Sequence, residues 1–239
     1  MADPYLQKTV MGPLVRQVYQ TTDHKCCLFR ARMRVCADGA PKAYHPLPGE
    51  ALGLDDLSSA GLPNDNYAIA TDAGGHLCVQ KADEQAPGFY VSMTRYSNPK
   101  VADDTRQNKY VDASTINYIV LSSPNFKQFT SQPNISLGNI GFAYNPANDT
   151  IQYAIFAETG PGSELGEASL QLVIKLGLGN ANNDARGGGT ESPDIIYGIF
   201  PGVSAPWPLS QSNIDQIAGA AFQTWGDRAR LVALITDLQ

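Results

Sequence analysis

Residues 151–177 read IQYAIFAETGPGSELGEASLQLVIKLG, and the architecture expected for the whole chain follows from this segment. Its first part alternates between two faces as a β-strand does, and neither face is strongly polar, so we expect this strand to be buried on both sides. A loop rich in Gly and Pro follows. The apolar spacing after the loop predicts a helix from about residue 166 to Gly177.

Two acids flank the loop of this segment. Glu158 ends the predicted strand beside apolar neighbours, where poor solvation raises the pKa of a carboxyl and suits a general acid. Glu167 opens the predicted helix, where the N–H groups and the helix dipole favour an ionised carboxylate and suit a general base. Two carboxyls, one protonated and one ionised, are the catalytic groups of most glycosidases. The alternative interpretation is ordinary helix capping by Glu167 and a solvated Glu158.

Outside this segment, frequent Gly and Pro divide the chain into short apolar runs, which predicts many strands and few helices. Apolar spacing predicts a helix from Ser212 to Trp225, stopped by Gly226, and a short helix at 54–60. Residues 179–193 are expected to form a long mobile loop. We expect a single catalytic domain over residues 26–239 after an extension at residues 1–25. Further strands are expected at residues 27–35, 67–71, 89–96, 116–122, 139–144 and 195–200.

The composition of the chain excludes several classes of protein. With 239 residues, 43% of them hydrophobic and 17% charged, the chain can bury a core and is not intrinsically disordered. It has 17 Lys and Arg against 23 Asp and Glu, a net charge of −6. This balance argues against a duplex nucleic-acid binder and suits a cationic ligand. No apolar run is long enough for a transmembrane helix.

The cysteines and the N-terminal residues give information on the cellular compartment of the protein. Cys26, Cys27, Cys36 and Cys78 contain no C-x-x-C pair, so we expect no structural zinc site, while disulfides and free thiols both stay open. The first residues do not resemble a signal peptide. The protein is therefore either intracellular or a mature secreted form, and the resemblance given below favours the secreted form.

Several catalytic motifs are absent from the sequence. It has no G-x-S-x-G, no phosphate-binding G-x-x-x-x-G-K-[ST], no H-E-x-x-H and no strand-anchored G-x-G-x-x-G. Because only 3 histidines occur, far apart in sequence, carboxylates are the expected acid–base groups.

Seven ordered stretches give the chain a resemblance to the fungal-type chitosanases of glycoside hydrolase family 75, from about residue 30 to residue 225. They are ADGAPKAYH (37–45), GLDDL (53–57), APGFY (86–90), YVDASTINYIV (110–120), GNIGFAY (138–144), LGEAS (165–169) and IIYGIFPG (195–202). The resemblance implies internal cleavage of β-1,4-linked glucosamine polymers with inversion and without a cofactor. Its two essential acids fall on Glu158 and Glu167. Glu158 stands where the family usually has Asp, and Ala168 where Gly is usual.

The departure at position 158 has a physical consequence. Glu is one methylene longer than Asp, so its carboxyl would move by roughly 1–1.5 Å unless the backbone retreats, and an inverting pair needs about 6.5–9.5 Å between its carboxyls. Two outcomes are compatible with this change: reduced activity or an altered substrate, or a compensating backbone shift that keeps the activity normal.

The same segment is similar to the strand–acid–loop–helix unit of double-psi β-barrels such as expansins. The fold implied is mainly β, a six-stranded double-psi-like barrel core with peripheral helices and strands. This similarity favours Glu158 as the proton donor.

A cleft for a polyglucosamine should carry further carboxylates and aromatic rings. Asp38, Asp72 and Asp112 lie beside predicted strand ends or turns and are candidate substrate-binding residues, although a turn Asp often bonds its own backbone. Tyr44 and His45 are the aromatic candidates. We expect a monomer that binds a cationic amino-sugar polysaccharide and neither nucleic acid nor membrane, with no metal.

The function expected is an endo-acting chitosan hydrolase. One rival is a non-hydrolytic protein that binds or loosens cell-wall polysaccharide on the same barrel. Another is a lytic enzyme that acts on a peptidoglycan-like glycan.

Overall fold

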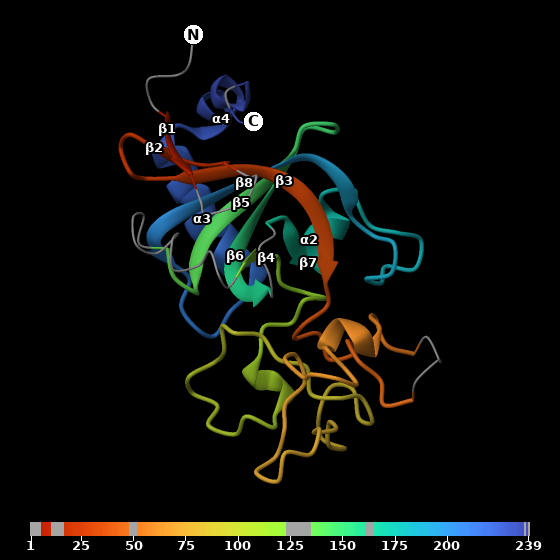
Figure 1. Ribbon diagram of the computed structural model, residues 1–239. Helices are drawn as coiled ribbons and strands as arrows, with labels where there is room; N and C mark the ends of the chain where they lie inside the picture. The colour runs from red at the N-terminus through yellow and green to blue at the C-terminus, as the bar shows by residue number, and fades with distance from the viewer. Residues whose placement is uncertain are drawn as a thin grey trace.

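The computed structural model describes residues 6–10, 17–47, 52–122, 135–160, 165–236 and 238. Figure 1 shows a β-barrel with helices at its side and a loop-rich region below it. The strands are β1 (Leu6–Val10), β2 (Gln17–Thr21), β3 (Cys27–Cys36), β4 (Tyr118–Ser122), β5 (Asn139–Asn145), β6 (Thr150–Gly160), β7 (Glu167–Ser169) and β8 (Thr190–Ser204). The helices are η1 (Leu57–Ala60), η2 (Gln107–Lys109), α2 (Leu170–Lys175), α3 (Gln211–Trp225) and α4 (Asp227–Ile235).

The sheet closes on itself. Its strand order is β1-β2-β3-β7-β4-β6-β5-β8, and a further pairing of β3 with β8 joins the ends of a six-stranded barrel. The strands β1 and β2 lie outside the barrel, where β2 pairs antiparallel with β3. The predicted mainly-β class with a six-stranded barrel is confirmed. The division of the chain at residue 25 stays a prediction.

Alternation along the strands produces two hydrophobic clusters on opposite faces of the sheet. In β4, Tyr118 and Val120 belong to one cluster, and Ile119 and Leu121 to the other. The predicted strands at 116–122, 139–144 and 195–200 lie within or overlap β4, β5 and β8. In contrast, residues 67–71 and 89–96 contain only isolated bridges, such as Ile69 to Ser92.

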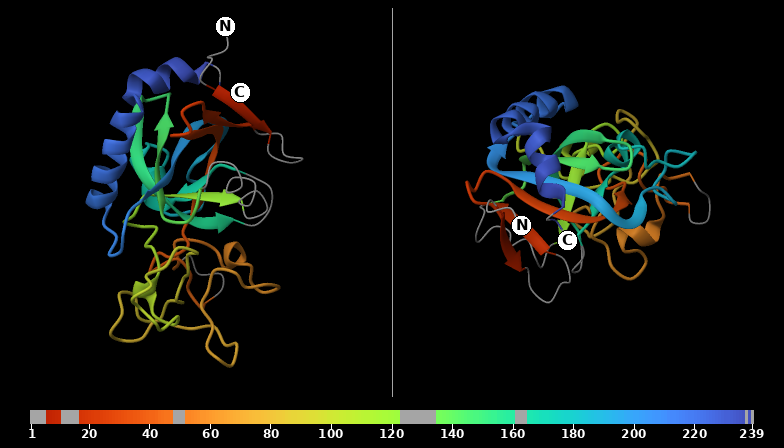
Figure 2. Two further views of the ribbon diagram at one scale, coloured as in Figure 1. Left: turned by 90° about the vertical axis from the view of Figure 1, so that its left-hand side faces the viewer. Right: turned by 90° about the horizontal axis from the view of Figure 1, so that it is seen from above.

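Helix α3 lies along one side of the barrel (Figure 2) and is confirmed nearly as predicted. Its Phe222 ring meets Phe142 of β5 edge to face, with 4.9 Å between ring centroids. The Phe142 ring also packs against Gly198 of β8, where an added Cβ would lie 2.1 Å from the ring. Gly226, with φ of 128°, ends the helix. The sequence did not predict α4, which follows at once.

Two predictions for the segment that precedes β8 in the sequence need correction. The helix expected from residue 166 begins only at Leu170, with the Ser169 side chain accepting from Leu172 N–H as its N-cap. The loop expected at 179–193 is shorter, because β8 already begins at Thr190. Before it, the Asn180 side chain bonds Asp184 and the backbone of Arg186.

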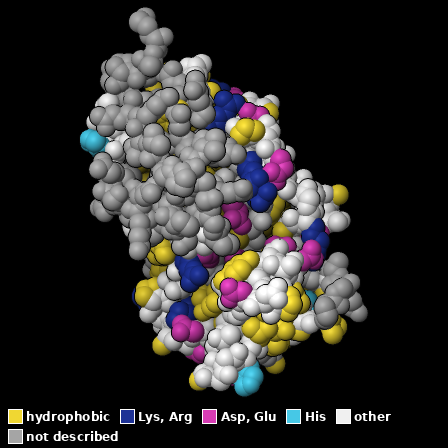
Figure 3. All heavy atoms as spheres, viewed as in Figure 1, with side chains coloured by type: hydrophobic (Ala, Val, Ile, Leu, Met, Phe, Trp, Pro, Cys, Tyr) yellow, Lys and Arg dark blue, Asp and Glu magenta, His cyan; other side chains and the backbone are white. Residues whose placement is uncertain are grey.

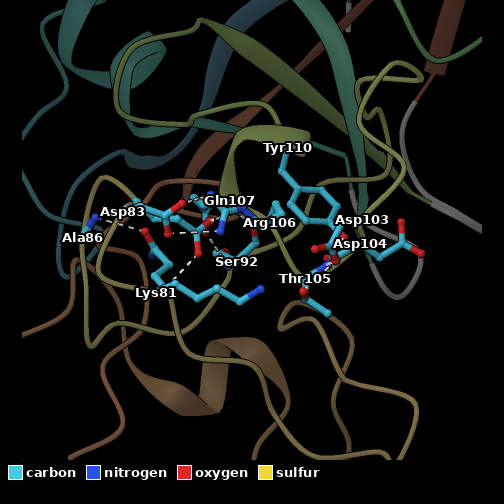
Figure 4. Close-up of polar contacts among 12 residues, drawn as sticks. Lys81, Asp83, Ala86, Ser92, Asp103, Asp104, Thr105, Arg106, Gln107 and Tyr110 are labelled. Carbon is cyan, nitrogen blue, oxygen red and sulfur yellow. Dashed lines mark hydrogen bonds and ion pairs between the residues drawn. The ribbon is translucent and has the colours of Figure 1, made fainter.

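The loop-rich region, residues 37–47 and 52–117, is held together by polar side-chain contacts rather than by sheet (Figure 4). Gln107 is central: its side chain accepts from Ser92 N–H at 2.8 Å and donates to Ser92 O and Gly39 O. Arg106 forms a two-point ion pair with Asp83. The bonds of Gln107 satisfy backbone groups that a sheet would otherwise satisfy.

The four cysteines are free thiols, three of them buried. Among the described residues, the helices are too short or too polar to cross a bilayer.

Candidate active site

A cavity of about 1110 Å³ lies between one end of the barrel and the loop-rich region. The ends of β3, β6 and β7 form one wall, and residues of the loop-rich region form the other. In the space-filling view, acidic and basic side chains gather along this boundary (Figure 3). The acidic residues that line the cavity are Asp38, Asp55, Asp65, Glu158 and Glu167, and the basic ones are Arg32, Arg34 and Arg95.

Glu158 and Glu167 occupy the same row of the sheet. Val120 of β4 is the register partner of Glu158 on parallel β6 and also of Glu167 on antiparallel β7. Residues opposite one another across a sheet point to the same face, and Val120 also lines the cavity. With about 4.8 Å between neighbouring strands, the two backbones are roughly 10 Å apart. This spacing is compatible with about 6.5–9.5 Å between the two carboxyls.

Glu167 lies on a strand, and the prediction that it opens a helix is wrong. Gly166 has φ of 101°, and a Cβ there would lie 2.2 Å from Arg32 O, so this glycine lets the chain approach β3 closely. Pairing with β3 and β4 then holds residues 167–169 extended. Consequently the dipole of α2 does not begin at Glu167, and the ionised state expected from it does not follow.

Burial instead raises the pKa of Glu167 to about 7, against a hydrogen bond from the Cys36 thiol and the charges of Arg34 and Arg32, which lower it. The room for this side chain comes from Gly160, where an added Cβ would lie 3.1 Å from Glu167 Oε2. Glu167 therefore keeps its proton to a higher pH than an exposed glutamate does.

Glu158 is buried, with 6% of its surface exposed, at the end of β6. Burial and the charge of Asp38 raise its pKa to about 8. Two backbone donors fix the carboxyl: Thr159 N–H donates to Oε1 at 2.7 Å, and Arg95 N–H donates to Oε2 at 2.8 Å. The raised pKa expected from the sequence is confirmed.

The structure brings Asp38 and Tyr44 into the same cavity. Tyr44 Oη donates to Asp38 Oδ1 at 2.5 Å, and burial raises the pKa of Asp38 to about 7. Both side chains therefore stand beside the two glutamates, as the sequence suggested.

The other three candidates do not line this cavity. Asp72 and Asp112 bond their own turns, Asp72 accepting from Gly74 N–H and Asp112 from Ser114 N–H. The His45 ring meets Phe89 edge to face. Their roles in substrate binding stay predictions.

Sequence reasoning missed several residues of the cavity, among them Asp55 and Arg95. Asp55 Oδ1 accepts from Asp56 N–H at 2.7 Å and from Ser59 Oγ at 2.9 Å, and burial raises the pKa of Asp55. Arg95 Nε lies 3.8 Å from Glu158 Oε1. Asp55 belongs to the stretch GLDDL, so a signal was present, whereas nothing in the local sequence marks Arg95.

A buried and a half-buried carboxyl on one row of a sheet, both lining a large cavity rich in acidic residues, fit a carboxylate-dependent glycoside hydrolase site. Residues 67–230 match the model of the family described as fungal chitosanase of glycosyl hydrolase group 75. The chain therefore belongs to this family of chitosanase-type glycoside hydrolases. The matched range includes Glu158 and Glu167 and begins after Asp38, Tyr44 and Asp55. No curated protein matches the chain.

Proposed function

We propose that the protein cleaves internal β-1,4 linkages of chitosan by an inverting mechanism, with Glu158 as general acid and Glu167 as general base. The observation that carries this proposal is the shared register of the two glutamates with Val120 at the wall of one cavity. That arrangement supports a sugar linkage lying between the carboxyls with room for a water molecule.

The acid role of Glu158 follows from its burial. Because its pKa is about 8, Glu158 carries a proton at the mildly acidic pH where chitosan is soluble as a polycation. It gives this proton to the glycosidic oxygen as the bond from that oxygen to the anomeric carbon breaks. The donors Thr159 N–H and Arg95 N–H then stabilise the carboxylate that is left.

The base role of Glu167 needs its ionised form. Glu167 has the lower pKa of the pair, about 7, and ammonium groups of a bound polyglucosamine would lower it further. Ionised Glu167 takes a proton from the water that attacks the anomeric carbon from the opposite face. The substrate's positive charge thus helps to prepare the base, which favours a cationic polymer over a neutral one.

The cavity wall supports the same substrate class. Asp55 and Asp65 supply carboxylates beyond the pair, and the partly exposed ring of Tyr67 offers a surface for a sugar. Since a polymer does not cross a membrane unaided, we also propose that the protein acts outside the cell.

The test measures reducing ends released from chitosan by the wild type, Glu158→Gln and Glu167→Gln. The matched control is Asp227→Asn, since Asp227 is exposed at the start of α4, away from the cavity. We expect a loss of at least about 10²-fold in each Gln variant and near-normal rates in the control. Wild-type rates in both Gln variants would remove the pair from the mechanism.

Proton NMR of a fresh digest tests the stereochemistry. Inversion of a β-linkage gives the α-anomer first, whereas early β-anomer would overturn the inverting mechanism. Binding of chitosan without any product would favour a non-hydrolytic binding protein instead.

A further inference from the structure

The Asp38-Gly39 turn is fixed by groups outside the turn. Gly39 has φ of 82°, its N–H donates to Ser92 Oγ at 2.9 Å, and its carbonyl accepts from Gln107 Nε2 at 2.8 Å. An added Cβ at Gly39 would lie 2.0 Å from Val111 O. The Asp38 carboxyl is therefore not used to hold its own turn, as a turn Asp usually is, and it faces the cavity.

The position of the Asp38 carboxyl is set by two tyrosines. Tyr44 Oη donates to its Oδ1 at 2.5 Å, and Tyr118 Oη donates to the Asp38 backbone carbonyl at 2.8 Å. Both tyrosines are fully buried. An acid held this firmly at the wall is suited to act on a neighbouring group rather than to follow a substrate along the cleft.

The groups that face this carboxyl come from every element around it. They are Cys36 of β3, Tyr118 of β4, Glu158 of β6, Glu167 of β7, and Tyr44, Asp55 and Tyr67 of the loop-rich region. Arg95 is the cation beside Glu158. After burial, Asp38 is the largest cause of the raised pKa of Glu158, and Glu167 in turn raises the pKa of Asp38. Asp38 thus interacts with both glutamates, and all three carboxyls line the same cavity.

We propose that Asp38, which the Tyr44 hydroxyl holds at the wall of the cavity that Glu158 also lines, is a positioning residue that acts through Glu158: the ionised carboxylate of Asp38 disfavours a second charge on Glu158 and keeps the proton there for the leaving group. This inference rests on the proposed function, in which Glu158 is the general acid. Its effect falls on the alkaline side of the activity range. There Asp38 has lost its proton while Glu158 still holds one.

The test is the pH profile of kcat/KM for Asp38→Asn. Asn keeps an oxygen for the Tyr44 hydrogen bond and removes the charge. We expect the alkaline limb of this profile to move to lower pH by roughly half a unit to one unit. The matched control is Asp65→Asn, which removes an equal charge from an exposed position in the same cavity. Its alkaline limb should stay in place.

A second variant covers the case in which Asp38→Asn does not fold. The hydrogen bond from Tyr44 lowers the pKa of Asp38, so Tyr44→Phe leaves Asp38 less ionised and should move the alkaline limb in the same direction by a smaller amount. An unmoved limb in a folded, active variant overturns the proposal. So does a loss of activity at every pH, which would make Asp38 a catalytic or binding residue. Full activity of Glu158→Gln would instead refute the proposed function, so the two failures are distinguishable.

Discussion

The backbone N–H of Arg95 donates to Glu158 Oε2 at 2.8 Å, which fastens the loop-rich region to the end of β6 through the carboxyl of the proposed acid. The next residue repeats the connection, since Tyr96 N–H donates to Ala157 O at 2.9 Å. The cavity wall and the acid are therefore placed by the same contacts. A change in side-chain length at position 158 affects both.

Shortening the side chain of Glu158 should reduce activity, even though Asp is expected at this position from the resemblance to family 75. In Glu158→Asp the carboxyl retreats by roughly 1–1.5 Å and cannot keep both backbone donors in place. Where positioning supplies the rate, a displacement of about 1 Å costs about 10²-fold. We expect a loss of that order in kcat, measured on chitosan, with the fold checked by circular dichroism. A variant as fast as wild type would show that this site is not adapted to Glu.

The pH dependence of stability should be unusual for an acidic protein. Asp38, Glu158 and Glu167 have pKa values raised to about 7, 8 and 7, above their ordinary values of 3.8, 4.5 and 4.5. The native state then binds more protons than the unfolded state, so its stability falls as pH rises from about 4 to about 8.

Urea unfolding at pH 4.5, 6 and 8 measures this trend. The variants Glu158→Gln and Glu167→Gln should each flatten the curve, because the amide cannot ionise. Stability that rises from pH 5 to pH 8 in the wild type would show that the pKa values of these carboxyls are not raised in the folded protein.

How much of this could be predicted from sequence depends on the range of the interaction. Helix α3 was found because its apolar spacing is local, and the raised pKa of Glu158 because its apolar neighbours are adjacent in the chain. The strand state of Glu167 was missed because it results from pairing with β3, which is distant in sequence. For the same reason Arg95 could not be assigned, since its contact with Glu158 depends on how the loop-rich region folds back onto β6.

Loss of the Gln107 side chain should destabilise the loop-rich region. Gln107→Ala leaves three buried backbone groups without their partner: the N–H and carbonyl of Ser92 and the carbonyl of Gly39. Each unsatisfied buried group costs about 1–3 kcal/mol, so we expect a loss of at least about 2 kcal/mol in the free energy of unfolding, measured with urea.

Thr105→Ala is the control, because the Thr105 hydroxyl donates to the exposed Asp103 in the same region. A loss below about 0.5 kcal/mol is expected there. Equal effects of the two substitutions would mean that the Gln107 contacts do not hold this region.

Binding of a cationic oligomer should release protons from the enzyme. Near pH 6.5 Glu167 and Asp38 are partly protonated, and ammonium groups brought into the cavity lower the pKa of both carboxyls. We expect proton release on binding of a glucosamine oligomer to a catalytically inactive Glu158→Gln variant, measured by calorimetry in two buffers of different ionisation enthalpy. The N-acetylated oligomer of equal length is the matched ligand, and it should release few protons because it carries no ammonium groups. Equal proton release with both oligomers would mean that the substrate's charge does not prepare the base, and the preference for a cationic polymer would then need another cause.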